Sequence, residues 1–206
     1  MGAGAAQLSQ RIISQMVEWT QAGLSAPARL LPAGEQFVEW VQYPAVEALD
    51  RHSGWKFYYH AHPRSERLAR ENGHFHIFVP GPDDVHDGAA LFSHLIGISV
   101  DSQGLPLRLF TTNQWVTGES WQPAEALVEF VKSPGLTHTQ PADVAGWLGH
   151  LIELYAVEIC ALLRARDKRL QARALMEKTN PYEDRRLRIP SQRNISLLQR
   201  ISRAGS

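Results

Sequence analysis

Residues 55–79, WKFYYHAHPRSERLARENGHFHIFV, organise the rest of the chain. This stretch holds two His-x-His pairs, His60/His62 and His74/His76, each inside a run of aromatic and aliphatic residues. Side chains alternate between the two faces of an extended strand, so each pair should project both imidazoles from one face, about 7 Å apart. Pairing of the two strands would place four imidazoles on one patch, which is the arrangement of a metal site.

A divalent transition metal is the expected cofactor, zinc first and then iron, copper or manganese, because neutral imidazole is a good ligand for all of them. The expected ligands are His60, His62, His74 and His76, with His94 as a fifth candidate. Three imidazoles would leave one coordination position open for chemistry, whereas four would close it. The alternative is that these histidines only hydrogen-bond within a polar core, although burying unpaired imidazoles is costly. No role is assigned to the remaining histidines, His52, His86, His138 and His150.

The rest of the chain predicts an α+β fold. Alternating apolar runs bounded by Pro, Gly and Asn predict four strands, at residues 55–62, 74–79, 91–100 and 105–111. The short links between them imply an antiparallel sheet. Helical spacing of apolar residues predicts helices over residues 5–22, 34–50, 121–131 and 141–178. We therefore expect a sheet of about four strands flanked by N-terminal helices and a long C-terminal helix.

Strand parity defines which residues share the histidine face. Tyr58 falls on the face of the first pair and Phe78 on the face of the second. On the third predicted strand, parity places His94 on the same face as Ile96 and Ile98. Both faces of that strand are mostly apolar, so helices should cover at least part of each side of the sheet.

The domain organisation expected is a single α+β domain over residues 1–178 and a C-terminal tail over residues 179–206. An apolar cluster in the tail predicts a short docking helix, from Ile195, Leu197, Leu198 and Ile201. Beyond Arg164 the long helix becomes polar and rich in arginine. This end should project into solvent or lie on a partner, and a homo-oligomer is one option.

Composition argues against several classes of protein. Lys+Arg and Asp+Glu are equal at 21 each, so no overall basic field favours a nucleic-acid partner. No apolar stretch reaches membrane-spanning length and no secretory pattern opens the chain, so a cytoplasmic protein without a membrane partner is expected. The single cysteine, Cys160, rules out an internal disulfide and a cysteine-based zinc site.

A second candidate region is TTNQWVTGESW, residues 111–121, where polar and aromatic groups occur together as they do in ligand pockets. We expect Asn113 and Trp115, together with Tyr58, to contact a small-molecule ligand. Glu119 is the candidate general acid/base or fourth metal ligand. Glu71, just before the second histidine pair, is a candidate for orienting a ligand. The simpler interpretation of each carboxylate is a solvated surface group.

The segments YYHAHP, ENGHFHIF, HLIGISVDSQGLP and TTNQWVTGE together resemble a bacterial family of unknown function, over roughly residues 54–166. The resemblance implies a shared site but no named reaction, and the site comprises His60, His62, His74, His76, His94, Asn113, Trp115 and Glu119. The His-x-His pairs are also similar to those of cupins and of alpha-class carbonic anhydrases. A cupin has a glutamate soon after the second histidine, where this chain has residues 77–80, IFVP. Carbonic anhydrases of that class are larger and nearly all sheet. Both therefore serve only as precedents for ligand geometry.

Three functions remain open from the sequence. The first is a metal-dependent enzyme in which Glu119 carries a proton. The second is a non-enzymatic metal or small-ligand binding module, which a closed four-histidine site would favour. The third is a structural protein that docks on another chain through its arginine-rich end.

Overall fold

The computed structural model describes residues 3–32, 34–82, 91–177 and 180–204. The helices are α1 (Ala3–Gln21), α2 (Gln114–Thr117), α3 (Ala124–Val131), α4 (Ala142–Leu154), α5 (Ala156–Glu177) and α6 (Leu197–Ala204). Three short 3-10 helices are η1 (Ala28–Leu30), η2 (Arg64–Glu66) and η3 (Pro181–Glu183). The strands are β1 (Tyr43–Leu49), β2 (Lys56–His60), β3 (Gly73–Pro80), β4 (Phe92–Val100), β5 (Pro106–Phe110) and β6 (Gln192–Asn194). The α+β class is confirmed, but the described residues form six strands and not about four.

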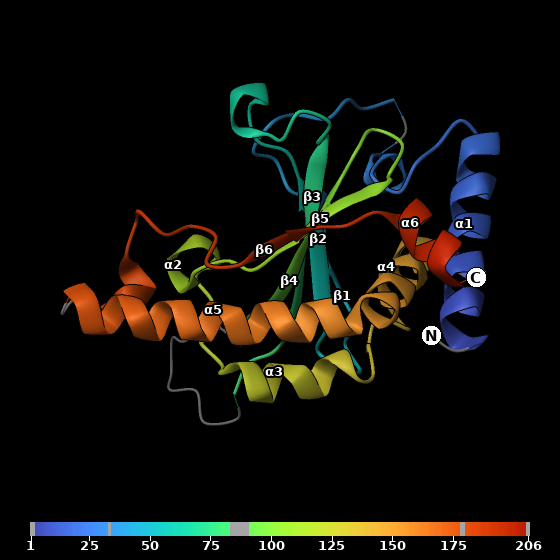
Figure 1. Ribbon diagram of the computed structural model, residues 1–206. Helices are drawn as coiled ribbons and strands as arrows, with labels where there is room; N and C mark the ends of the chain where they lie inside the picture. Colours follow the sequence, from blue (N-terminus) through green and yellow to red (C-terminus); the bar gives the residue numbers. More distant parts are fainter. Residues whose placement is uncertain (1–2, 33, 83–90, 178–179, 205–206) are drawn as a thin grey trace.

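The sheet is an antiparallel meander in which each strand pairs with the next in the order β1-β2-β3-β4-β5-β6. Figure 1 shows α1, α4 and α6 on one side of the sheet and α2 with the segment after η3 on the other. On the first side, Phe75 of β3 packs against Trp147 of α4, with ring centroids 5.8 Å apart. Trp147 in turn contacts Trp19 of α1, at 5.7 Å. This side of the sheet is therefore the hydrophobic core, and the opposite side is left for polar groups.

The predicted second N-terminal helix over residues 34–50 is wrong. Residues 34–42 form turns and extended chain, and Tyr43–Leu49 is the edge strand β1. Proline lacks the backbone N–H that a helix interior needs, but it is tolerated near the start of an edge strand, where Pro44 lies. The prediction rests on Phe37, Val38, Trp40 and Val41 as an inward-facing stripe, but Val38, Trp40 and Val41 are exposed, so their spacing does not mark a buried helix face.

The predicted continuous helix over residues 141–178 is broken at Tyr155, where α4 and α5 meet at a bend of 75°. The bend lets α4 bury its apolar residues against α1 while α5 packs on α3. The described residues contain no single helix with the length and apolar composition of a membrane span; α4 and α5 reach it only as this bent pair.

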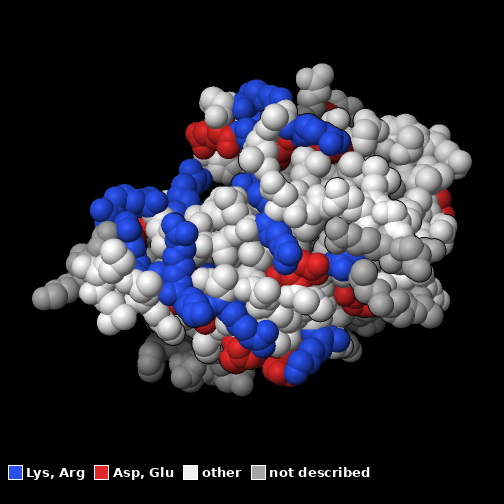
Figure 2. All heavy atoms as spheres, viewed as in Figure 1, with Lys and Arg blue, Asp and Glu red and all other residues white. Residues whose placement is uncertain are grey.

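The expected solvent projection of the arginine-rich helix end is wrong in part. Figure 2 shows Lys and Arg side chains gathered over α5 and the C-terminal segment. Arg166, however, is 1% exposed and lies over the Trp121 ring, 3.8 Å from its centroid. Arg173 pairs with Asp184 at 2.7 Å. Much of this positive charge is thus used within the chain, because Asp184 and Trp121 come from segments that pack on α5.

The segment after η3 is tied across the polar side of the sheet. Asn113 donates its backbone N–H to Arg188 O at 2.9 Å, and Ser191 Oγ donates to Leu162 O at 2.8 Å. The chain then adds β6 beside β5 and ends with α6 packed on α1. As a result, Arg188 and Ile189 of this segment line the cavity described below.

Candidate metal centre

The β2–β3 register aligns the two histidine pairs on the polar face of the sheet. His60 lies opposite His74, and Tyr58 lies opposite His76. Directly opposed residues on one face of an antiparallel pair have Cβ atoms about 5 Å apart, so their imidazoles meet. Strand parity predicts which residues of β2 and β3 face this side, and the register determines which of them are neighbours.

Three imidazoles converge closely enough to hold a metal ion. His60, His74 and His76 each offer one nitrogen, and these nitrogens all lie within 4.8 Å of one another. The closest pair is His60 Nε2 and His74 Nε2, at 2.8 Å. In a tetrahedral zinc site the ligand nitrogens are about 3.3 Å apart, since each zinc–nitrogen bond is about 2.0 Å. Small side-chain rotations would therefore convert this cluster into a ligand set.

His62 lies beside the three converging histidines and not among them. It follows the end of β2, and its ring stacks on that of His74 with centroids 5.1 Å apart. Its Nδ1 is 3.4 Å from Glu66 Oε2, which is close enough for an ion pair, but the two atoms do not form a hydrogen bond. The structure thus presents three convergent imidazoles, with the fourth imidazole, that of His62, in the cavity wall beside them.

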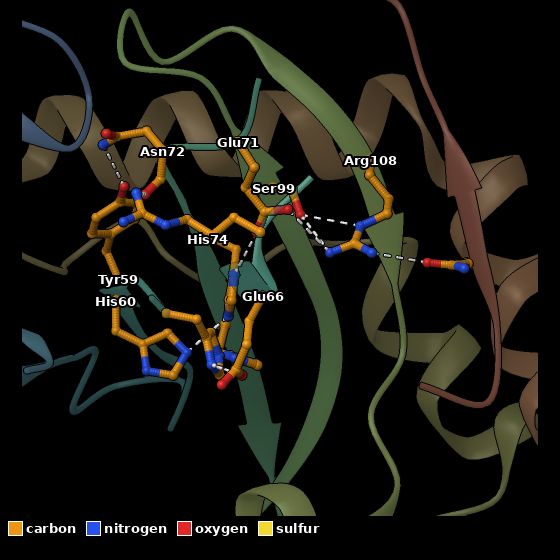
Figure 3. Close-up of polar contacts among 12 residues, drawn as sticks. Tyr59, His60, Glu66, Glu71, Asn72, His74, Ser99 and Arg108 are labelled. Carbon is orange, nitrogen blue, oxygen red and sulfur yellow. Dashed lines mark hydrogen bonds and ion pairs between the residues drawn. The ribbon is translucent and has the colours of Figure 1, made fainter. Parts of the chain in front are cut away.

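A buried ionic chain orients His74 (Figure 3). His74 Nδ1 contacts Glu71 Oε1 at 2.8 Å, and Glu71 Oε2 accepts from Arg108 at 3.2 Å. Arg108 also donates to Ser99 Oγ and, at 2.9 Å, to Gln192 Oε1. A carboxylate that holds Nδ1–H leaves the Nε2 lone pair directed at the metal position, as in many zinc sites. Sequence analysis missed Arg108, although an arginine within the apolar strand PLRLF is a usable signal.

Burial alone would raise the pKa of Glu71, but its hydrogen bond with His74 and the positive charge of Arg108 outweigh burial and lower that pKa. Glu71 is therefore an anion at neutral pH, as the orienting role requires.

A β-bulge moves His94 onto the histidine face. Ile77 pairs with Ile96 while Phe78 pairs with His94, so Leu95 is an extra residue in β4. The extra residue reverses parity, and the prediction that His94 shares a face with Ile96 and Ile98 is therefore wrong. His94 Nε2 lies 3.0 Å from His76 Nδ1. His94 thus orients His76 in the way that Glu71 orients His74.

Glu119 reaches the site through His94. Its Oε2 accepts the backbone N–H of His94, and its Oε1 lies 3.5 Å from Thr117 Oγ1. Burial raises the pKa of Glu119 to about 8, against the opposing effects of the His94 N–H and the Arg166 charge. The cavity beside the histidines is lined by Thr117 and not by Glu119. Glu119 consequently holds its proton near neutral pH and is separated from the cavity by the side chain of Thr117.

The other predicted ligand-contacting residues occupy different places. Asn113 caps α2 through Gln114 N–H and donates Nδ2 to Pro181 O at 2.9 Å. Trp115 donates Nε1 to Asp184 O, also at 2.9 Å. Both side chains hold the segment that follows α5, and neither lines the cavity. Tyr58 does line it, with its ring 5.1 Å from that of His76.

The histidine cluster opens into a cavity of about 570 Å³. Its walls include aromatic and aliphatic side chains from the segment before β1 and from β2, β5, α2 and the segment after η3, among them Trp40, Tyr58, Phe110, Val116 and Ile189. Among the described histidines, His52, His138 and His150 do not contribute to this lining, and His86 lies outside the described residues. The volume is suited to a small molecule.

Burial keeps the clustered histidines neutral. Loss of solvation, followed by repulsion from neighbouring imidazoles, lowers the pKa of His60 to about 3 and holds that of His76 well below its ordinary value. Burial and the charge of Arg166 likewise lower the pKa of His94 to about 3. Metal ligation requires neutral imidazole, so the cluster is in the right protonation state.

The metal-free protein is expected to lose stability as the pH falls from about 6.5 to about 5. Unfolded histidines take up protons near pH 6.5, whereas the folded pKa values of His60 and His94 are about 3. The unfolded state therefore binds more protons below pH 6.5, so the free energy of unfolding decreases, by at least about 2 kcal/mol at pH 5. Urea unfolding in the presence of a chelator at both pH values measures this loss.

Glu119 supplies the control for this pH dependence. Its folded pKa of about 8 lies above its unfolded value, so its contribution to stability is present at low pH and lost as the pH rises through 8. Glu119→Gln should therefore steepen the loss of stability on acidification. An unfolding midpoint that is the same at pH 7 and pH 5 would contradict burial of neutral histidines.

Gly97 makes room for Phe110 next to the cluster. The two residues are paired between β4 and β5, and a Cβ on Gly97 would overlap the Phe110 ring. That ring contacts His74 edge-on, with centroids 5.2 Å apart. Gly97→Ala should lower the free energy of unfolding by about 1–3 kcal/mol through overpacking. Equilibrium urea denaturation is the measurement.

Gly146 of α4 is the matched control, because a Cβ there meets nothing within 4 Å. Gly146→Ala should be neutral or stabilising, since alanine is the better helix former. Adding Phe110→Leu to Gly97→Ala should restore part of the loss. If both alanine variants are equally stable, Phe110 does not pack over Gly97 as the structure shows.

The fold and the site define an α+β protein whose antiparallel sheet presents a three-histidine cluster able to hold a metal ion. The chain belongs to the family described as Domain of unknown function (DUF6969), which matches residues 6–195. The resemblance to an uncharacterised domain family is thereby confirmed. No curated protein and no solved structure matches the chain.

Proposed function

We propose that this protein is a metal-dependent enzyme that binds a divalent transition metal ion through His60, His74 and His76. Zinc is the first choice for this ion. The observation that carries the proposal is the convergence of three imidazole nitrogens within 4.8 Å at the wall of an open cavity. Three protein ligands with space beside them are typical of catalytic metal sites, whereas structural sites are closed by four.

The donor set fits such an ion. Nitrogen ligands suit zinc, copper, iron and nickel better than calcium or magnesium. The Nδ1 atoms of His74 and His76 are occupied by Glu71 and His94, which leaves the Nε2 atoms for coordination. When bound, the ion would supply Lewis-acid chemistry at its open position.

The remaining residues would handle protons and substrate. Glu119, protonated near neutral pH, is the proposed proton carrier and would deliver the proton toward the cavity through Thr117 Oγ1. Tyr58 would contact the substrate from the cavity wall. Asn113 and Trp115 would support the site indirectly, by holding the segment that carries the wall residues Arg188 and Ile189.

Metal content decides the proposal. Protein purified without added metal, or loaded with zinc and then freed of excess, should contain about one equivalent by elemental analysis, and a chelator should lower its melting temperature. A metal-free protein whose melting temperature is unchanged by zinc, iron, copper or manganese would overturn it.

The open coordination position has its own test. The visible spectrum of the cobalt-substituted protein should change on addition of azide, because azide can occupy a free position on the ion. A cobalt spectrum that does not respond to azide would instead indicate a closed site, which is the expectation for a metal-binding module without catalysis.

A further inference from the structure

The cavity beside the histidine cluster combines an apolar wall with a polar corner. Trp40, Tyr58 and Phe110 provide aromatic surface, and Trp40 remains 53% exposed although its ring lies 4.3 Å from that of His62. The polar corner contains Thr112 and Arg188. A ligand that fills this space therefore needs both an apolar body and a polar group.

The charges around the cavity indicate the sign of that polar group. The charged lining residues are Glu66, Glu71, Arg108 and Arg188, so two cations balance two anions. Metal-ligating imidazoles are neutral and add nothing to this balance. A divalent ion at the cluster would leave two positive charges in excess, which favours an anionic ligand.

Arg188 is the lining cation best able to contact a ligand. Arg108 is 12% exposed and is engaged by Glu71, Ser99 and Gln192. Arg188 is 50% exposed, and its Nη1 lies 3.7 Å from Glu66 Oε2. A half-exposed pair at that distance is worth little, so Arg188 can exchange it for a ligand at small cost.

Thr112 supplies an unsatisfied polar atom next to Arg188. The residue is 2% exposed, lines the cavity, and within the described part of the chain its Oγ1 has no hydrogen-bond partner. The backbone bond from Asn113 N–H to Arg188 O places the two residues on adjacent segments. Buried hydroxyls are almost always hydrogen-bonded, so this buried, unpartnered Oγ1 on a wall residue is a group that a ligand can engage once the side chain turns toward the cavity.

We propose that this cavity binds a small organic carboxylic acid, with the carboxylate held by Arg188 and Thr112 and the apolar part packed against Trp40, Tyr58 and Phe110. An arginine fork and a hydroxyl are well matched to a carboxylate, which accepts several hydrogen bonds. The inference deepens the proposed function, because it names the substrate class of the same site, and it rests on that function for the excess positive charge.

Calorimetric titration of the zinc-loaded protein tests the assignment with benzoate, hexanoate, benzamide and inorganic phosphate as probes. A carboxylate probe should bind at least about tenfold more tightly than benzamide, its neutral counterpart, since the charge-assisted bonds are lost. Arg188→Met should weaken that binding about tenfold, and Thr112→Val should weaken it by a smaller factor. Arg169→Met, an exposed arginine of α5 outside the cavity, is the matched control and should leave binding unchanged.

Each contrary result overturns the proposal: no binding of either carboxylate, equal affinity for benzoate and benzamide, or unchanged binding in Arg188→Met with normal zinc content. Arg188-dependent binding of phosphate in preference to both carboxylates would overturn the organic-acid assignment. If the protein binds no metal, the proposed function fails, and titration of the metal-free protein decides this inference alone. In that case, carboxylate binding that depends on Arg188 would support the carboxylic-acid site, and an absence of binding would reject it.

Discussion

Replacing His60 with alanine is expected to lower the affinity for zinc by more than about a hundredfold. Loss of a residue that only orients a ligand costs about 10–100-fold, and His60 supplies a ligand atom itself. His60 is only partly buried at the end of β2, so the fold should survive its truncation. Competition with a chromophoric chelator measures the affinity, and circular dichroism checks the fold.

His62→Ala is the matched control for this experiment. His62 is two residues away and also faces the cavity, but its nitrogens lie outside the convergent group. Its truncation should change zinc affinity by less than about tenfold. Equal losses for His60→Ala and His62→Ala would mean that four histidines ligate the ion, and the site would then be closed.

Glu71→Gln should have the largest effect on stability, lowering the free energy of unfolding by about 3 kcal/mol or more. Glu71 is 3% exposed and joins His74 to Arg108. Without the carboxylate, Arg108 becomes a buried charge with only neutral partners, which costs about 3–5 kcal/mol. Zinc affinity should fall about 10–100-fold as well, because His74 loses its orienting group.

Two variants separate the buried charge from a general effect of losing a carboxylate. Glu129→Gln removes an exposed partner of Lys132 and should cost less than about 1 kcal/mol. Adding Arg108→Met to Glu71→Gln should recover part of the stability, since the unpaired charge is removed. Urea unfolding measures the free energy of unfolding of each variant. If Glu71→Gln loses no more of it than Glu129→Gln does, the ionic chain in Figure 3 is contradicted.

Local patterns predicted the central strands and the N-terminal helix. The predicted strands at 55–62, 74–79, 91–100 and 105–111 correspond to β2, β3, β4 and β5, since buried strands carry long apolar runs. The missed strands, β1 and β6, are the two edges of the sheet. Val46 of β1 is 84% exposed and β6 is exposed throughout, so neither shows the alternation that marks a buried face.

Side-chain alternation is a property of a single strand, so the sequence alone places His74 and His76 on one face. His62 lies beyond the end of β2, although it borders the same cavity as His60. Only the tertiary structure decided that His60, His74 and His76 converge while His62 stands aside, because this depends on the register between β2 and β3. The tertiary structure also decided two other features of the site. The bulge at Leu95 turns His94 toward His76, and the path of residues 181–191 brings Arg188 to the cavity. Both arise from pairings between segments distant in the chain, and such pairings leave no local periodic signal.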